Sequence, residues 1–159
     1  MWRRVEIEPR IADHPPERVF PYLADPARWH EFAPAVVQRR QIGDGPAEVG
    51  TRWAATDRIG PFKVHFFDEL VERETDRRVV WLSTTPWNSR VEYVCMPDGS
   101  GTRIHARYEG DVAGWLRLVA LLPTPILAWI LGRDFKGLRA RLAAETRRQG
   151  GTATGGTAG

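Results

Sequence analysis

The sequence predicts an α+β domain in which an antiparallel sheet covers a long C-terminal helix. Three observations lead to this class. A first strand is followed by two short helices that begin at prolines, six further strand-like segments follow one another through short links, and an apolar stripe with helical spacing lies after residue 124. At 159 residues the chain can bury about two thirds of its unfolded surface around one core, so we expect a single domain over residues 1–149.

The N-terminal segment has the pattern of a strand. Val5, Ile7 and Ile11 are separated by charged side chains. This period of two is typical of a strand that buries one face and exposes the other.

Two short helices are predicted after this strand. Asp13 precedes Pro15 and Pro16, which favours an N-cap followed by proline in the first turn. Asp25 and Pro26 begin a second helix, and a proline at position 34 ends it. The apolar residues expected to face inward from the two helices are Val19, Phe20, Leu23, Trp29 and Phe32.

The middle of the chain reads as a succession of strands joined by turn clusters. The links are GDGPAEVG, IGP, ETDRR, TPWN and PDGSG, which are too short for crossover helices. The strands must therefore pair in antiparallel fashion. Their expected ranges are 36–42, 51–58, 62–71, 79–84, 90–96 and 102–108.

The C-terminal region, residues 114–142, contains the most apolar part of the chain, WLRLVALLPTPILAWIL. Prolines at positions 123 and 125 divide it into two parts. The part after them continues a helix with an apolar stripe at spacings of three and four, formed by Leu127, Leu131, Phe135, Leu138 and Leu142. The part before them has no partner in this stripe, and the tail 150–159 has nothing to bury, so we expect the tail to be disordered.

Composition excludes several classes of protein. The net charge of +3 comes from 23 basic and 20 acidic residues that are interspersed along the chain, which argues against nucleic-acid binding. The prevalence of Arg over Lys is typical of a G+C-rich bacterial genome. The single Cys95 cannot form an intramolecular disulfide, and we expect it to be a buried thiol. Because a strand pattern begins by Val5, no secretory signal is expected and the predicted location is cytoplasmic.

A membrane span is not expected. Residues 112–131 are long enough to cross a bilayer core, but they contain Arg117 and the two prolines, which are costly in a spanning helix. Residues 115–130 nevertheless hold more apolar side chains than one helix stripe requires. They could line a cavity entrance, contact a membrane surface or pair with another subunit, and the oligomeric state stays open.

Several strings of this sequence resemble the START-like helix-grip superfamily, also called the SRPBCC or Bet v 1-like group, which includes polyketide cyclase/dehydrase and lipid-transport-type proteins. They are PPERVFPYLADPARWHEFAP at 15–34, Gly50-Thr51 after the glycine-rich turn, and PDGSGTRI at 97–104. No single string is diagnostic, but their order and spacing extend over residues 2 to about 148. The resemblance implies a helix-grip fold, in which a seven-stranded curved sheet grips the C-terminal helix, two short helices close one end, and a ligand cavity lies between.

No metal site or cofactor is predicted. The four histidines show no spacing typical of metal ligands, and no second ligand type accompanies them. His65 lies on a strand that is apolar on both faces, so its direction is open; the resemblance favours Phe66 and Leu70 as the inward residues and places His65 outside. Asp68 shares their parity and could present a carboxylate inside, or it could mark a bulge or a solvated strand end.

A hydrophobic ligand is the predicted partner. Aromatic residues alternate toward the expected concave face, and such walls with a few polar groups suit a mixed apolar ligand. The seven tryptophans are equally compatible with a filled core. The candidate ligand-binding residues are Trp53, Phe66, Asp68, Trp81, Tyr93, Tyr108 and Trp129.

Three functions follow from this pattern. The first is binding of a lipid, isoprenoid or polyketide-like molecule in the cavity. The second is a polyketide cyclase/dehydratase-type enzyme that folds a reactive chain in the same cavity, although no specific catalytic motif is present and the catalytic residues stay unknown. The third is an interaction protein with a filled core. A shared fold does not choose among them.

Overall fold

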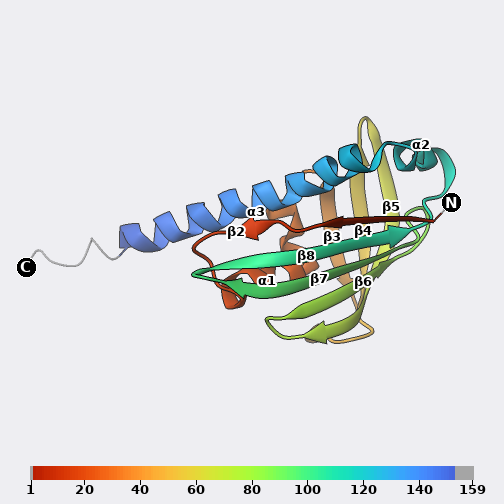
Figure 1. Ribbon diagram of the computed structural model, residues 1–159. Helices are drawn as coiled ribbons and strands as arrows, with labels where there is room; N and C mark the ends of the chain where they lie inside the picture. Colours follow the sequence, from red (N-terminus) through yellow and green to blue (C-terminus); the bar gives the residue numbers. More distant parts are fainter. Residues whose placement is uncertain (1, 153–159) are drawn as a thin grey trace, which may run out of the picture.

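The computed structural model describes residues 2–152 as a strongly curved antiparallel sheet with one long helix across its concave side (Figure 1). The strands are β1 (Arg3–Ile7), β2 (Arg10–Ile11), β3 (Val36–Ile42), β4 (Arg52–Ile59), β5 (Phe62–Glu74), β6 (Arg78–Ser83), β7 (Ser89–Asp98) and β8 (Gly101–Gly110). The helices are α1 (Pro16–Ala24), α2 (Arg117–Ala120) and α3 (Thr124–Thr152), with 3₁₀ turns η1 (Pro26–Glu31) and η2 (Gly114–Leu116).

The sheet has the order β1-β8-β7-β6-β5-β4-β3, and every pairing is antiparallel. The predicted meander and helix-grip architecture are confirmed. The predicted first strand is divided, because the chain leaves the ladder at Pro9 and then resumes as β2, which also pairs with β8. Figure 1 shows the first strand beside the last one, so β1 forms one edge of the sheet and β3 forms the other.

The two short helices follow β2 as predicted, but the first begins differently. Asp13 does not cap α1: its backbone has φ of 64°, and its carboxylate accepts a hydrogen bond from Ser100 Oγ at 3.3 Å. Pro15 occupies the N-cap position instead. The prediction at Asp25 is confirmed, since its Oδ1 accepts a hydrogen bond from the Ala27 backbone N–H at 3.1 Å and starts η1.

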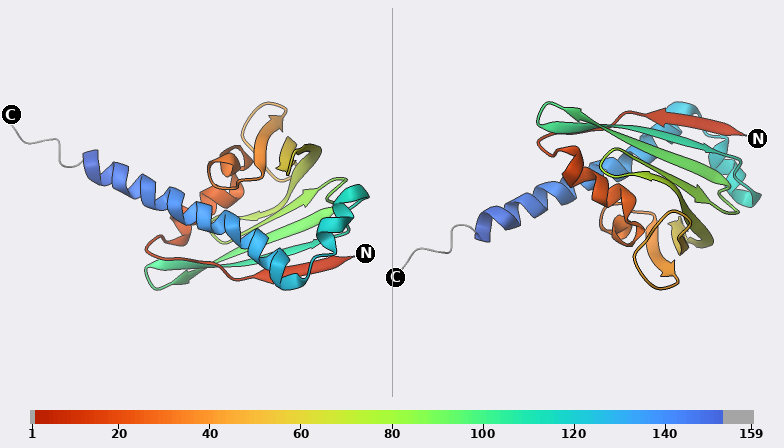
Figure 2. Two further views of the ribbon diagram at one scale, coloured as in Figure 1. Left: turned by 90° about the horizontal axis from the view of Figure 1, so that it is seen from above. Right: turned by 90° about the horizontal axis from the view of Figure 1, so that it is seen from below.

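Helix α3 crosses the concave face diagonally and extends beyond the sheet at its C-terminal end (Figure 2). Its stripe is buried as predicted at Phe135, Leu138 and Leu142, whereas Leu127 and Leu131 are half-buried because they face a cavity. The helix runs to Thr152, so the first three residues of the predicted disordered tail are helical. The rest of that tail, residues 153–159, lies outside the described residues.

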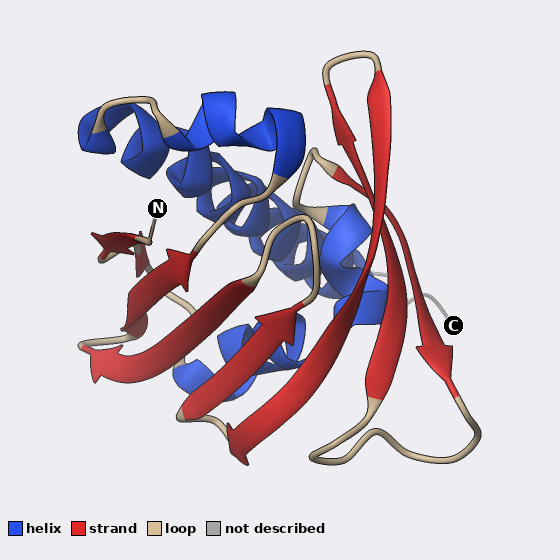
Figure 3. Cartoon of the chain, turned by 90° about the vertical axis from the view of Figure 1, so that its right-hand side faces the viewer, coloured by secondary structure: helices blue, strands red, loops and turns tan. Residues whose placement is uncertain are grey.

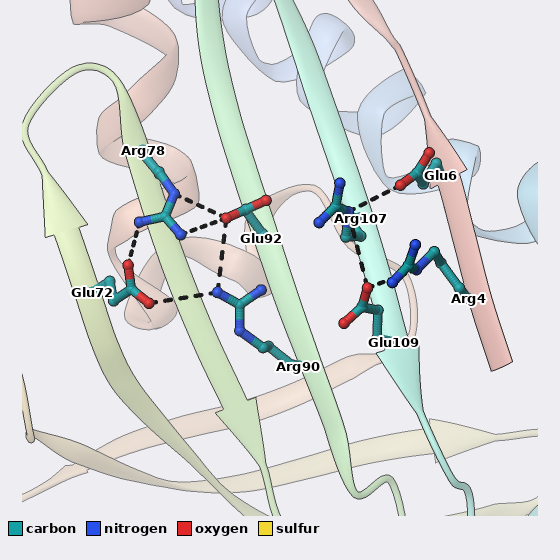
Figure 4. A network of polar contacts seen from close by, with 8 residues as sticks. All are labelled: Arg4, Glu6, Glu72, Arg78, Arg90, Glu92, Arg107 and Glu109. Atoms are coloured by element: carbon teal, nitrogen blue, oxygen red, sulfur yellow. Dashed lines mark hydrogen bonds and ion pairs between the residues drawn. The ribbon is translucent and has the colours of Figure 1, made fainter. Parts of the chain in front are cut away.

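The outer face of the sheet carries a network of ion pairs (Figure 4). Arg78 bridges Glu72 and Glu92, and Arg107 pairs with Glu6 at 2.9 Å. These side chains alternate with inward residues along β7 and β8, which is why this face is polar and the opposite face is free for a core. Exposed pairs of this kind contribute little stability individually.

One glycine sets the distance between α3 and the rest of the fold. A Cβ at Gly137 would lie 2.1 Å from the Phe32 carbonyl oxygen, so the helix backbone packs directly against the residue that follows η1. Gly132, earlier on the same helix, has open space around it.

Gly137→Ala should therefore lower the free energy of unfolding by about 2 kcal/mol, in the range typical of overpacked sites. Gly132→Ala is the matched control and should raise it by up to about 1 kcal/mol, because alanine is the better helix former. Urea denaturation of both variants measures the difference. A stabilised Gly137→Ala protein would show that this contact is looser than described.

Candidate functional site

A cavity of about 370 Å³ lies between the concave face of the sheet and α3. Figure 3 shows the strands curving around the helix. The volume is within the range of small-molecule sites, roughly 300–1,000 Å³. Most of the wall is apolar, with side chains from the sheet, η1, α2 and α3, including Val36, Ile59, Val91, Val119, Leu127, Ile130 and Leu131.

Aromatic rings form one wall of the cavity. Trp81 packs edge-on against Trp29 with ring centroids 5.1 Å apart, and Tyr93 packs against Phe135 at 6.0 Å. The Trp81 indole N–H donates to the Leu23 carbonyl oxygen at 3.2 Å, so this donor is already used within the protein. The wall is therefore apolar at these rings, and the Trp81 indole N–H has a partner within the fold.

Trp53 does not reach the cavity. Its ring lies 5.2 Å from that of Trp81, and the side chain is buried in the core but absent from the cavity wall. Trp81 contacts both Trp53 and Trp29, and it contributes to the wall where Trp53 does not. The structure thus places Trp53 in the core beside Trp81, outside the cavity wall to which Phe66, Asp68, Trp81, Tyr93 and Tyr108 contribute.

A buried ion-pair cluster stands in the otherwise apolar wall. Arg39 Nε donates to Asp68 Oδ2 at 2.7 Å, and Arg39 Nη1 donates to Asp57 Oδ1 at 2.9 Å. Ser83 Oγ donates to Asp68 Oδ1 at 2.6 Å. The guanidinium also lies 5.1 Å from the ring centroid of Phe66 and 5.4 Å from that of Trp29, where cation–π attraction is effective.

A β-bulge turns Arg39 inward. Val36 pairs with Asp57, and Arg39 pairs with Ala55. Because Asp57 and Ala55 lie on the same face of β4, Val36 and Arg39 lie on the same face of β3, although they are three residues apart. The register shift between Val36 and Gln38 produces this result, because one extra residue reverses the alternation. Simple alternation from Val36 would have placed Arg39 outside.

Burial raises the pKa of the Asp68 carboxyl, and the Arg39 guanidinium and the Ser83 hydrogen bond oppose this rise. The pKa of Asp57 is also raised by burial, again against the influence of Arg39. One cation is thus shared by two carboxylates that the fold has removed from water.

A third carboxyl faces the cavity from α3. Burial first, and then the negative charge of Asp57, raise the pKa of Asp134 to about 6, while Arg133 opposes this. Across the cavity, the hydroxyl oxygens of Tyr93 and Tyr108 are 3.4 Å apart, and burial raises both of their pKa values. The site therefore combines a carboxyl that titrates near neutral pH with two phenols that stay protonated.

Asp134 should make stability depend on pH. Its folded-state pKa is about 6 against an ordinary 3.8, so the folded state binds the proton more tightly and the free energy of unfolding falls as pH rises between these values. At neutral pH, Asp134→Asn should therefore raise the free energy of unfolding by up to about 3 kcal/mol relative to the parent. The charged and titratable groups around it are Arg39, Asp57, Asp68, Tyr93, Tyr108 and Arg133.

The measurement is urea denaturation of parent and variant at several pH values. Asp134→Asn should be more stable at neutral pH, and the two curves should converge at pH values below the ordinary aspartate pKa. Parallel curves over the whole range would show that Asp134 is solvated in the folded protein.

The segment before the prolines covers one end of the cavity. Leu116 is buried against Phe66 and its neighbours, and Val119 and Ala120 line the cavity. Arg3 ties this segment to the sheet by donating to the carbonyl oxygens of Ala120 at 2.9 Å and Leu122 at 3.3 Å. We refer to residues 114–122 as the lid.

Trp129 does not line the cavity. It is 67 % exposed, and the Arg133 guanidinium lies 5.6 Å from its ring centroid. The cavity side of α3 is formed by Ile130, Leu131 and Asp134, and the helical period then places Trp129 toward solvent. The outer face of the lid and of the first turns of α3 is apolar, with exposed Trp115, Leu118, Leu121, Ile126 and Trp129.

The remaining predicted side chains are placed as follows. Phe66, Asp68, Trp81, Tyr93 and Tyr108 all line the cavity. His65 is exposed, with its Nδ1 at 3.0 Å from Thr56 Oγ1, so its side chain points away from the cavity. Cys95 is buried, and burial raises its pKa to about 12, as suits an inert thiol.

Sequence reasoning missed Arg39, Asp57 and Asp134. Asp57 shares parity with Trp53 and Ala55, and Asp134 lies three residues after Leu131 and four before Leu138, so both had a readable signal. Arg39 had none, because its direction depends on the bulge. Within residues 2–152 no group of three or more His, Cys, Asp or Glu side chains is arranged to hold a metal ion.

No helix among the described residues is by itself long and apolar enough to span a membrane; the η2–α2 segment and α3 reach the required length only together, across a bend of 103°.

A family model described as polyketide cyclase/dehydrase and lipid transport matches residues 3–147, the whole of the sheet and most of α3. The chain belongs to this family. A search of curated proteins gave no match to the sequence. The family therefore supplies the architecture and a set of candidate functions, and the cavity must distinguish between them.

Several solved structures have the same fold as this chain. TTHA0849 from Thermus thermophilus is 20% identical, with a TM-score of 0.72 over 90% of this chain and 99% of that one. The ZhuI aromatase/cyclase from Streptomyces sp. R1128 is 13% identical, with a TM-score of 0.66 over 98% and 99%. Ara h 8.0201 is 13% identical, with a TM-score of 0.67 over 91% and 99%. At such identities the likeness shows the fold alone.

Proposed function

We propose that this protein binds a hydrophobic small molecule in the cavity between the sheet and α3. The observation that carries the proposal is a cavity of about 370 Å³ whose wall is mostly apolar and whose polar groups are confined to a few side chains. Apolar walls supply the affinity and the few polar groups orient the ligand. A filled core, as an interaction protein would have, leaves no such space.

The test combines native mass spectrometry of the purified protein with binding of a neutral, environment-sensitive naphthalene dye. Leu131→Trp places an indole in the cavity and should abolish dye binding. Leu121→Trp adds the same ring on the exposed side of the lid and is the matched control. Unchanged binding by Leu131→Trp, together with loss in Leu121→Trp, would place the dye on the outer surface and refute the proposal.

An enzyme acting in the same cavity is the second candidate, of the polyketide cyclase/dehydratase type. One observation favours it: Asp134, with a pKa of about 6, faces the same cavity as two protonated phenols, Tyr93 and Tyr108. A carboxyl that titrates near the working pH is suited to general acid–base catalysis. The shaped cavity would hold a reactive chain in one folded conformer.

Replacing Asp68, Tyr93, Tyr108 and Asp134 one at a time tests this candidate. With polyketide-like substrates, at least one replacement should reduce turnover while leaving the fold intact by circular dichroism. Unchanged turnover of a processed substrate in all four variants would exclude these groups as the acid and base.

We infer that the outer face of the lid contacts an anionic lipid surface. Its apolar side chains are exposed, and between Val112 and Arg133 the chain contains no acidic residue but two arginines, Arg117 and Arg133. Phe62, at the tip of the β4–β5 hairpin, extends the apolar surface by packing against Trp115 at 5.2 Å. Apolar insertion combined with basic side chains is the pattern of interfacial membrane contact.

Co-sedimentation with vesicles of phosphatidylcholine, with and without phosphatidylglycerol, measures this contact. Binding should require the anionic lipid and should be reduced in Leu118→Glu. Leu82→Glu, on an exposed part of β6, is the control. Equal binding by both variants, or no binding by the parent, would leave the lid without a role at lipid surfaces.

A further inference from the structure

The charged groups that face the cavity are unequal in sign. One guanidinium, Arg39, faces the interior together with the carboxyl groups of Asp57, Asp68 and Asp134. The wall has two further charged residues, and both have other partners. Arg3 donates to the lid carbonyls, and Glu109 pairs with Arg4 at 2.7 Å.

Arg39 is already shared by two anions. Its Nε serves Asp68 and its Nη1 serves Asp57, and both carboxylates are largely removed from water. The three groups together carry one negative charge when both carboxylates are ionised. A buried excess charge is unfavourable unless a counter-charge or a donor is supplied.

Acceptor oxygens are left over on the cavity side. Among the described residues, Asp57 Oδ2 has no hydrogen-bond donor, and Asp134 takes part in no hydrogen bond or ion pair. Arg133, the nearest residue of opposite charge along the chain, has its guanidinium over the exposed ring of Trp129. Asp57 on β4 and Asp134 on α3 both line the same cavity, so the two carboxyls face a common space.

A ligand with a positively charged, donor-rich end matches this arrangement. An ammonium group carries three N–H donors and no acceptor, so it can serve Asp57 and Asp134 together. A carboxylate ligand would instead add a fourth anionic group beside a single guanidinium. The spare Nη2 of Arg39 suits a neutral acceptor, such as a ligand carbonyl, because the charge of this arginine is already shared by two carboxylates.

We propose that the cavity selects apolar molecules that end in an amine and rejects those that end in a carboxylate, with Asp134 and Asp57 as the groups that hold the amine. This proposal rests on the proposed binding function and gives its ligand class.

Three matched ligands test the proposal: decylamine, decanol and decanoate, which share one alkyl chain and differ in the polar end. Their Kd values are measured at neutral pH, below micelle formation, by displacement of the neutral naphthalene dye and by native mass spectrometry. Decylamine should bind about tenfold more tightly than decanol, the ratio that corresponds to one charge-assisted hydrogen bond. Decanoate should bind most weakly.

Asp134→Asn should weaken the binding of decylamine more than that of decanol, so that the preference for decylamine over decanol falls by about tenfold. Asp44→Asn removes the same charge from the exposed β3–β4 loop and should change neither value. Because Asp134→Asn is expected to stabilise the protein at neutral pH, loss of binding through unfolding is not expected, and circular dichroism verifies the fold.

The outcomes separate the two proposals. If decanoate binds as tightly as decylamine, or if Asp134→Asn keeps the amine preference, the ligand class is wrong and the cavity function stands. If none of the three ligands displaces the dye from the cavity, the proposed binding function fails and the ligand class fails with it.

Discussion

Arg39→Met should lower the free energy of unfolding by about 3–5 kcal/mol, the range for removing one partner of a buried ion pair. The loss has a definite cause: Asp57 and Asp68 would stay buried without the guanidinium that faces both. Methionine fills similar volume, so the change tests the charge more than the packing. Chemical denaturation at neutral pH measures the effect.

The pH dependence of this variant has a predicted sign. Without Arg39, the pKa values of Asp57 and Asp68 should rise further above their ordinary values, because burial is then unopposed by the cation. The folded variant then binds protons more tightly than the unfolded chain, so the deficit relative to the parent should shrink as pH falls.

Arg40→Met is the matched control. Arg40 is the next residue along β3, it is exposed, and it makes no ion pair among the described residues. Its replacement should change the free energy of unfolding by less than about 0.5 kcal/mol. Equal effects at the two positions would contradict the inward direction of Arg39.

Phe135→Ala should lower the free energy of unfolding by about 3–5 kcal/mol, as is usual for loss of a buried aromatic ring. Phe135 is 2% exposed and packs edge-on against Tyr93, so it is a principal contact between α3 and the sheet. Denaturation with urea measures the loss, and the dye assay should show that the enlarged cavity still forms.

Trp129→Ala is the control on the same helix. Its ring is largely exposed, so its removal should change stability by less than about 0.5 kcal/mol. A loss below about 1 kcal/mol for Phe135→Ala would contradict a helix gripped by the sheet.

Much of the fold could be predicted because its elements carry strong local patterns. The strand ranges follow from alternation and turn residues, and the antiparallel order follows from links too short for crossovers. Phe135, Leu138 and Leu142 were identified by helical spacing alone, and all three are buried. Asp13 was misassigned as a cap because a left-handed turn and an N-cap favour the same residue type.

The candidate site was predicted less completely than the fold. Phe66, Asp68, Trp81, Tyr93 and Tyr108 have the parity of an inward face, and each lines the cavity. Strand parity correctly placed Trp53 on the inward face, but parity does not show whether an inward side chain reaches the cavity. Trp53 packs beside Trp81 in the core instead. Trp129 was included for its apolar character, yet the rotation of α3 about its axis leaves it outside.

The sequence by itself determined which faces are apolar, where the strands and helices lie, and that the last helix needs a cover. These properties depend on residues close together in the chain, through the strand and helix periods. Only the tertiary structure decided that Arg39 points inward and that Asp57, Asp68 and Asp134 share one cavity. A bulge is a property of two paired strands, and the meeting of β3, β4, β5 and α3 depends on how the sheet curves, so no local pattern could show that an apolar cavity holds three carboxyls and one arginine.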